Sequence, residues 1–136
     1  NFRKRSGDFG AEDVGDVLHS GDFGFAEETG AGMTVGLKAG LDMQKVVQAV
    51  GGGAAGSWAM LNRSGNMIKN DYPLGFKVTL HRKDLNIALE VARELGVTLP
   101  VTAFVEQVET GLITRGHGDE DISTIARGVR EPSGIK

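Results

Sequence analysis

The sequence predicts an all-α fold, a multi-helix bundle joined by short turns, and three observations support this prediction. Apolar residues recur at helical spacing in most segments after position 42. Glycine and proline fall where these periodic segments start or stop. The alternation typical of a strand is not convincing anywhere. The chain has 136 residues, which is enough for one domain with a real core but not for two domains of ordinary size.

Residues 1–24 differ in composition from the rest, and we interpret them as a flexible, Gly/Asp-rich arm preceding a helical domain at residues 25–136. Ser6-Gly7-Asp8-Phe9-Gly10 recurs as Ser20-Gly21-Asp22-Phe23-Gly24. A repeated turn that binds calcium or an anion is the alternative. Two copies are too few for a repeat architecture, and the aspartates lack the further acidic ligands of a calcium loop.

Residues 25–39 are ambiguous, because each glycine inside them costs a helix about 1 kcal/mol relative to alanine. If they form a helix, packing holds it and Gly40 ends it. The next segment, residues 42–50, is a clearer helix, for which Asp42 is a natural N-cap. Its apolar residues recur at i, i+3, i+4 and i+7: Met43, Val46, Val47 and Val50.

Residues 51–56 read Gly-Gly-Gly-Ala-Ala-Gly, which matches the G-x-G-x-x-G pattern of dinucleotide-binding loops. In such loops the glycines follow a strand and lead into a helix that holds a pyrophosphate. Here the preceding segment has helical phasing, and Asp71 belongs to a turn rather than to the end of a second strand. We therefore expect a helix C-cap and a short loop, then a helix that buries Trp58 and Leu61. The dinucleotide loop remains the alternative.

The strongest helical pattern follows a turn at Pro73 and Gly75 that leads into Phe76. Thr79 is expected to cap this helix, Gly96 to end it, and the other helices to pack around it. Its apolar face combines Leu85, Ile87, Ala88, Leu89, Val91, Ala92 and Leu95.

Two further helices are expected, separated by an acidic turn at residues 115–121. The first starts with Pro100 in its first turn, where proline is tolerated. The acidic end of the turn suits the N-terminus of the second helix, where the helix dipole favours negative charge. The predicted apolar faces are Val101, Phe104, Val105, Val108 and Leu112, then Ile122, Ile125, Ala126 and Val129.

Composition excludes several classes of function. A net charge of −3 leaves no basic footprint for nucleic acid, and no apolar run approaches the roughly 20 residues of a membrane span. The absence of cysteine excludes disulfides and thiolate chemistry, and the 3 histidines show no ligand spacing, so no metal site is expected. We expect a cytoplasmic protein. Asn1 in the first position suggests a fragment or a processed product.

Five blocks of residues occur in an order that resembles a known family. They are Gly53-Ala54-Ala55-Gly56-Ser57-Trp58, Tyr72-Pro73-Leu74-Gly75-Phe76, Leu80-His81-Arg82-Lys83-Asp84-Leu85, Gly96-Val97-Thr98-Leu99-Pro100 and Gly116-His117-Gly118-Asp119-Glu120-Asp121-Ile122-Ser123. The chain resembles, over about residues 25–131, the C-terminal helical domain of the β-hydroxyacid dehydrogenases. The resemblance implies a fold like the C-terminal domain of the 6-phosphogluconate and 3-hydroxyisobutyrate dehydrogenases.

This resemblance also implies a cofactor, a site and a partner. In the family a Rossmann domain binds NAD or NADP, while the helical domain closes the active site and supplies most subunit contacts, which implies a homo-oligomer. By resemblance, Lys83 would contact the nicotinamide end of the cofactor. Phe76 and Asp84 would line the pocket for a small hydroxyacid. From spacing alone, Lys83 and Asp84 would be a solvated pair and Phe76 a core aromatic.

Two parts of the family pattern are missing from the sequence. The dinucleotide-binding domain is absent, and the position expected for the catalytic lysine, near Gly15, holds no lysine. We therefore expect an isolated or truncated helical domain without dehydrogenase turnover of its own. The alternative is a non-catalytic helical module that dimerises or binds a small molecule. Whether the chain is an enzyme stays open.

Overall fold

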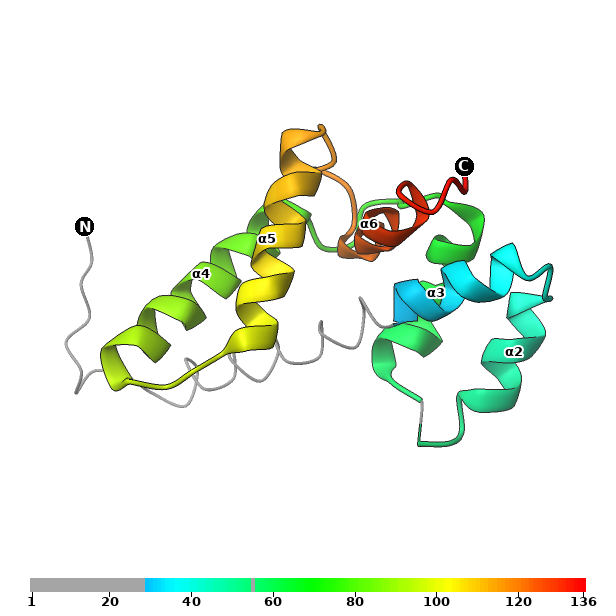
Figure 1. Cartoon of the computed structure of the whole chain (residues 1–136), viewed down its shortest axis with the longest axis horizontal. Helices are drawn as coiled ribbons and strands as arrows, with labels where there is room; N and C mark the ends of the chain where they lie inside the picture. Colours follow the sequence, from blue (N-terminus) through cyan, green and yellow to red (C-terminus); the bar gives the residue numbers. More distant parts are fainter. Residues whose placement is uncertain (1–28, 55) are drawn as a thin grey trace.

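The computed structural model describes residues 29–54 and 56–136, and these residues are mainly helical (Figure 1). Residues 29–38 are helical. The elements that follow are α2 (Met43–Val50), α3 (Trp58–Lys69), α4 (Val78–Leu95), α5 (Pro100–Thr114), the 3₁₀ helix η1 (Ile122–Ala126) and α6 (Arg127–Arg130). One isolated antiparallel bridge joins Lys77 to Asp121. The arm predicted for residues 1–24 lies outside the described residues.

Local chemistry sets several helix ends as predicted. Asp42 caps α2 by accepting a hydrogen bond from the Lys45 amide, and Pro100 is the first residue of α5. Gly96 ends α4 in the left-handed conformation, with φ 70°. Gly40 also has a positive φ of 76°, just after the helical residues 29–38.

The start of α4 is predicted wrongly, because the helix begins at Val78 and its N-cap is Lys77 rather than Thr79. Lys77 makes no side-chain capping bond. A distant segment satisfies the first amides of α4 instead: Val78 donates to the Glu120 carbonyl and Thr79 to the Gly118 carbonyl. A helix N-terminus needs acceptors for its free amides, but they need not come from its own cap.

The core of the described residues gathers around η1 rather than around α4. All five η1 residues are buried. The cluster consists of Met33, Met43, Ala59, Met67, Leu85, Val105, Leu112, Ile122, Ile125 and Ala126. Helix α4 packs mainly on α5 and also contacts η1, and its Ile87 is 40% exposed. The prediction that α4 is the central helix is therefore wrong.

Helix α3 buries a different face from the predicted one. Trp58 and Leu61, both predicted to be buried, are exposed. The buried positions are Ala59, Met60, Ser64 and Met67. The aromatic ring of Trp58 lies under the Arg63 guanidinium, 5.1 Å from the ring centroid, so this large side chain packs locally instead of entering the core.

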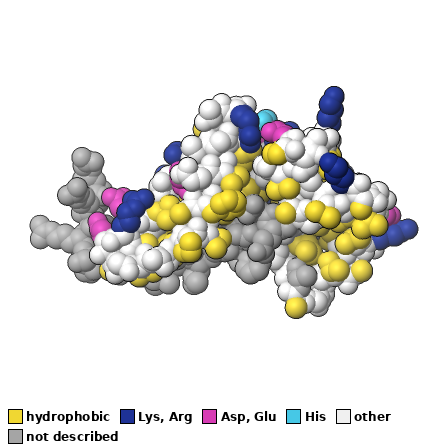
Figure 2. Space-filling view, in the orientation of Figure 1, with side chains coloured by type: hydrophobic (Ala, Val, Ile, Leu, Met, Phe, Trp, Pro, Cys, Tyr) yellow, Lys and Arg dark blue, Asp and Glu magenta, His cyan; other side chains and the backbone are white. Residues whose placement is uncertain are grey.

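Helix α5 has an unusual distribution of polar and apolar residues. Val105 and Leu112 are buried as predicted, but Val101 is 59% and Phe104 52% exposed. Two acidic residues of the same helix, Glu106 and Glu109, are buried. Figure 2 shows hydrophobic side chains on the surface over α5 and over the region of α2. No helix in residues 29–54 or 56–136 has both the length and the apolar character of a membrane span.

Candidate functional site

The predicted site residues Lys83 and Asp84 lie together on the second turn of α4. The Lys83 ammonium is 3.0 Å from Asp84 Oδ1, and the two side chains are 63% and 26% exposed. Lys83 can therefore reach a ligand in solvent while Asp84 limits the directions of its ammonium. An exposed pair of this kind contributes little to stability, so stability alone does not account for it.

Phe76, the third predicted site residue, lies toward the other side of α4. It packs partly against the core, and its ring contacts His81 edge-on with centroids 6.0 Å apart. His81 and Lys83 are two residues apart, which places them about 200° apart around a helix. The structure thus brings Lys83 and Asp84 together but places Phe76 with the buried face of α4.

A carboxylate that the sequence did not single out, Asp121, holds Phe76 in place. Asp121 is fully buried, and its Oδ2 accepts a hydrogen bond of 3.0 Å from the Phe76 amide. Its Oδ1 accepts bonds from the amide and hydroxyl of Ser123 and lies 3.3 Å from Arg63 Nε. The Phe76 carbonyl in turn accepts from the Ile122 amide at 2.9 Å.

Asp121 therefore joins α3, the turn before α4 and η1 at one point. The Phe76 amide and the amide and hydroxyl of Ser123 donate hydrogen bonds to its carboxyl oxygens, and the Arg63 guanidinium lies at ion-pair distance. The sequence placed Asp121 in an acidic turn and assigned it to the following helix N-terminus. That assignment is correct for η1, whose N-cap is Asp121. The contact with Phe76 crosses 45 positions of sequence and leaves no local signal.

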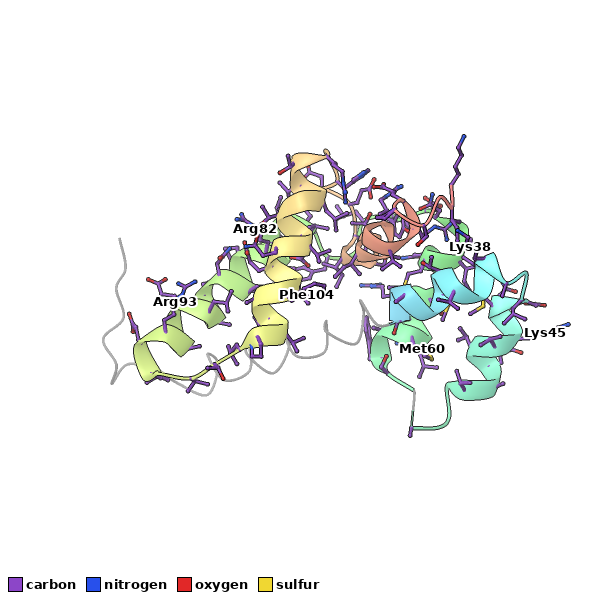
Figure 3. The ribbon with its side chains drawn as sticks, viewed as in Figure 1. Lys38, Lys45, Met60, Arg82, Arg93 and Phe104 are labelled. Carbon is purple, nitrogen blue, oxygen red and sulfur yellow. The ribbon has the colours of Figure 1, made fainter. Side chains whose placement is uncertain are left out.

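Polar side chains also fill part of the interface between α4 and α5. His81 Nδ1 lies 2.5 Å from Glu109 Oε1, and both side chains are only 1% exposed. One turn along α5, Glu106 Oε1 accepts a bond of 2.9 Å from Arg82 Nε, which also donates to the Thr110 hydroxyl at 2.7 Å. Arg82 lies on α4 beside α5 (Figure 3). Spacing alone predicted none of these pairs.

The environment of Glu109 favours its protonated form. Burial raises the pKa of the Glu109 carboxyl above its ordinary value, while the hydrogen bond and the charge of His81 act to lower it. The second carboxyl oxygen of Glu109, Oε2, has no hydrogen-bond partner among the described residues.

The glycine-rich segment after α2 has a structural role in chain reversal. It follows a helix rather than a strand, since α2 runs to Val50 and Gly51 is its C-cap. A Cβ on Gly56 would lie 2.2 Å from the Gly51 carbonyl oxygen and 3.0 Å from that of Gly53. Glycine allows this close approach of backbone to backbone. The strand–loop–helix context of a dinucleotide loop is not formed here.

Metal-ligating side chains do not gather in the part of the chain that the structure describes. No group of three or more histidine or acidic side chains there could hold a metal ion. The position near Gly15, where the resemblance places a catalytic lysine, lies outside the described residues. The candidate site therefore consists of Lys83 and Asp84 on the surface of α4, with Phe76 fixed behind them.

Comparison with known proteins gives a family match over most of the chain. Residues 26–129 match the family model described as "NAD-binding of NADP-dependent 3-hydroxyisobutyrate dehydrogenase". An uncharacterized oxidoreductase of Shewanella frigidimarina is 43% identical over 84 residues, 62% of this chain and 29% of the relative. The 2-hydroxy-3-oxopropionate reductase of Escherichia coli is 38% identical over 90 residues, 66% of this chain and 31% of the relative. The chain thus spans about a third of the length of these relatives.

Two solved structures share the fold. A 3-hydroxyisobutyrate dehydrogenase from Salmonella typhimurium superimposes with a TM-score of 0.76 at 23% identity, covering 84% of this chain and 40% of that one. The Mycobacterium tuberculosis 3-hydroxyisobutyrate dehydrogenase gives a TM-score of 0.71 at 19% identity, covering 88% of this chain and 42% of that one. At these identities the likeness concerns the fold alone.

The family match corrects the predicted fold class. The sequence predicted an all-α multi-helix bundle, assigned to a C-terminal helical domain whose cofactor is held elsewhere. The described elements are helical, but the matching model is described as an NAD-binding region, so that fold-class assignment is wrong. Helical periodicity reports which faces pack, and it carries no information on whether an exposed face binds a cofactor.

Proposed function

Because this chain belongs to the family of NAD-binding regions of NADP-dependent 3-hydroxyisobutyrate dehydrogenase, we propose that it forms one wall of a hydroxyacid dehydrogenase active site. Its cofactor by family resemblance is NAD or NADP. In this proposal Lys83 contacts the nicotinamide end of the cofactor, and Phe76 and Asp84 line the pocket for a small hydroxyacid. The wall closes the active site of a complete enzyme, in which the bound nicotinamide exchanges a hydride with the substrate.

The exposed Lys83 ammonium is the observation that carries this proposal. A lysine on a flexible stem suits a phosphate or ribose oxygen because its three donors can rotate toward the acceptor. Asp84 keeps the ammonium within reach of α4 without burying it. The rigid helix below the pair fixes where the lysine emerges. These properties are compatible with a dinucleotide at this surface.

Calorimetric titration of the chain with NADPH and with NADH tests the proposal. Lys83→Ala should weaken binding by at least about tenfold, which corresponds to about 1.4 kcal/mol. Lys45→Ala is the matched control, because Lys45 is also an exposed helical lysine paired with an aspartate three positions away, Asp42. Equal affinities for the wild-type and Lys83→Ala proteins would contradict the role of Lys83. Short hydroxyacids titrated in the presence of the cofactor then test Phe76 and Asp84.

A second candidate function is a helical module for subunit contact. The exposed apolar residues Val101 and Phe104 on α5, with Val97 in the turn before it, support this candidate. Three large apolar side chains this close in sequence favour association with another apolar surface. The two functions are compatible, since one surface can hold subunits together while another contacts the cofactor.

A further inference from the structure

The interface between α4 and α5 contains a buried hydrogen-bonded pair and an ion pair where apolar contacts would be expected. His81 with Glu109 is fully enclosed, and Arg82 with Glu106 borders the same interface. Leu85 and Val105, one turn away from His81 and Glu109 along their helices, are fully buried. Two helices of this length could pack through apolar residues alone. The presence of buried charge therefore calls for an explanation other than burial of apolar area.

Buried ion pairs are poor stabilisers but good determinants of geometry. The cost of removing two charges from water offsets most of their attraction, and well-packed apolar residues often replace such a pair without loss of stability. Fixing the register between helices is the best-attested role of such groups. The buried Glu109 carboxyl, with Oε2 unpartnered among the described residues, is an example of that cost.

The two pairs select one register between the antiparallel helices. His81 lies opposite Glu109, and Arg82 opposite Glu106 and Thr110. Sliding α4 by one turn, about 5.4 Å, would place Glu109 opposite Leu85 and leave its carboxyl group buried without a hydrogen-bond partner. An all-apolar interface would carry no such penalty, because leucine, valine and alanine repack with a smaller loss.

Register and rotation of α4 also decide where Lys83 emerges. Lys83 comes directly after His81 and Arg82 in the sequence and lies on the same helix. Rotation of α4 by one residue would turn Lys83 by about 100° relative to α5. We propose that the His81–Glu109 pair is a positioning device that fixes α4 on α5 and thereby directs Lys83 toward the cofactor. The inference rests on the proposed function of Lys83.

The test replaces both partners with apolar residues. His81→Leu with Glu109→Leu removes both polar side chains and should keep the free energy of unfolding at or above the wild-type value. The same variant should lose at least about tenfold in NADPH affinity, as does Lys83→Ala. Glu109→Gln keeps a hydrogen-bonding partner for His81 and should retain the affinity. Arg115→Ala with Glu131→Ala removes an exposed pair and should change neither property.

A second measurement needs no ligand. The sequence has no cysteine, so Glu90→Cys on α4 and Ala103→Cys on α5, both exposed positions, accept spin labels without background. Pulsed electron paramagnetic resonance should give one narrow distance distribution in the otherwise wild-type chain. The double leucine variant should broaden that distribution or split it in two. The glutamine variant should keep it narrow.

The outcomes separate the two proposals. A narrow distribution in the double leucine variant, or failure of that variant to fold, would overturn the inference that the pair sets register. A broad distribution with wild-type affinity would overturn the link to Lys83. If the wild-type chain binds no NADPH, or if Lys83→Ala binds as tightly, the proposed function fails. The distance measurement still decides whether the pair fixes α4.

Discussion

Asp121 connects three parts of the chain through a carboxylate with 0% exposure. Its neighbours leave no room for a side chain on the turn before α4. A Cβ on Gly75 would lie 2.7 Å from Asp121 Oδ2 and 3.0 Å from Arg63 Nη2. Gly75 is thus required by space and not by a left-handed backbone conformation. Because Gly75 has no side chain, the Phe76 amide can approach Asp121 Oδ2 to 3.0 Å.

Gly75→Ala should lower the free energy of unfolding by about 1–3 kcal/mol, the usual cost of forcing extra atoms into a packed site. Gly65→Ala in α3 is the control, since a Cβ there meets nothing within 4 Å. It should leave stability unchanged or raise it by up to about 1 kcal/mol, because alanine is the better helix former. Urea unfolding of both variants measures the difference. Equal effects at the two glycines would contradict the packing argument.

Helix α5 is an element whose charged side chains are structural. Glu106 and Glu109 contact Arg82 and His81 of α4, while Phe104 is 52% exposed. The raised pKa of Glu109 has a consequence for stability. Between pH 4.5 and that raised value, the folded state binds more protons than the unfolded state. The contribution of Glu109 to the free energy of unfolding therefore falls as the pH rises through this window.

Glu109→Gln should remove this dependence on pH. In the wild-type chain the contribution of Glu109 to folding is most favourable below pH 4.5 and declines above it. The difference in free energy of unfolding between the wild-type and Glu109→Gln chains should therefore shift in favour of the variant as the pH rises. Urea titrations at several pH values between 4.5 and 7.5 measure it. Parallel curves for the two proteins would contradict the assignment.

The pKa of Glu120 is shifted in the opposite direction, so Glu120 serves as the reference for Glu109. Burial acts to raise the pKa of its carboxyl, but hydrogen bonds from Thr124 and His117 and the charge of Arg127 outweigh it and lower the pKa. Its contribution to stability is present above pH 4.5 and is lost as the pH falls through the lowered value. Glu120→Gln should therefore cost the chain most at neutral pH. The contribution of Glu109 to stability thus declines as the pH rises, whereas that of Glu120 declines as the pH falls.

At the scale of the whole molecule, several helices expose large apolar side chains. Among the described residues these include Trp58, Leu61, Val101 and Phe104. Surfaces of this kind mark interaction sites in soluble proteins when the residues are contiguous. The second candidate function assigns the α5 surface to contact with another copy of the chain.

Phe104→Glu should shift the chain toward monomer by placing a charge at the middle of this surface. Light scattering over a range of concentrations measures the association. Gln48→Glu, an exposed change on α2, should leave association unaltered. A wild-type chain that stays monomeric at high concentration would count against the homo-oligomer, and so would an unchanged mass for Phe104→Glu.

Local signals in the sequence predicted local features. Asp42, Gly96 and Pro100 mark helix ends because capping depends on one residue and its neighbours. The inward face of α5 could not be predicted in the same way. Glu106 and Glu109 are buried only because Arg82 and His81 meet them from another helix, which apolar periodicity does not encode. The positions of Lys83 and Asp84 on α4 follow from spacing, but their proposed roles still depend on family resemblance.

The bonds between the start of α4 and residues 118–120 have a consequence for how this protein can be altered. The chain enters the α4–α5 hairpin at Thr79 and leaves it at Gly118, where the Thr79 amide donates to the Gly118 carbonyl at 3.0 Å. The two ends of the hairpin are therefore joined to each other by this hydrogen bond. A hairpin from a relative could replace residues 79–118 without a change in the path of the remaining chain. Natural variation in hairpin length would have to keep this bond and the packing of Leu85, Val105 and Leu112 in the core.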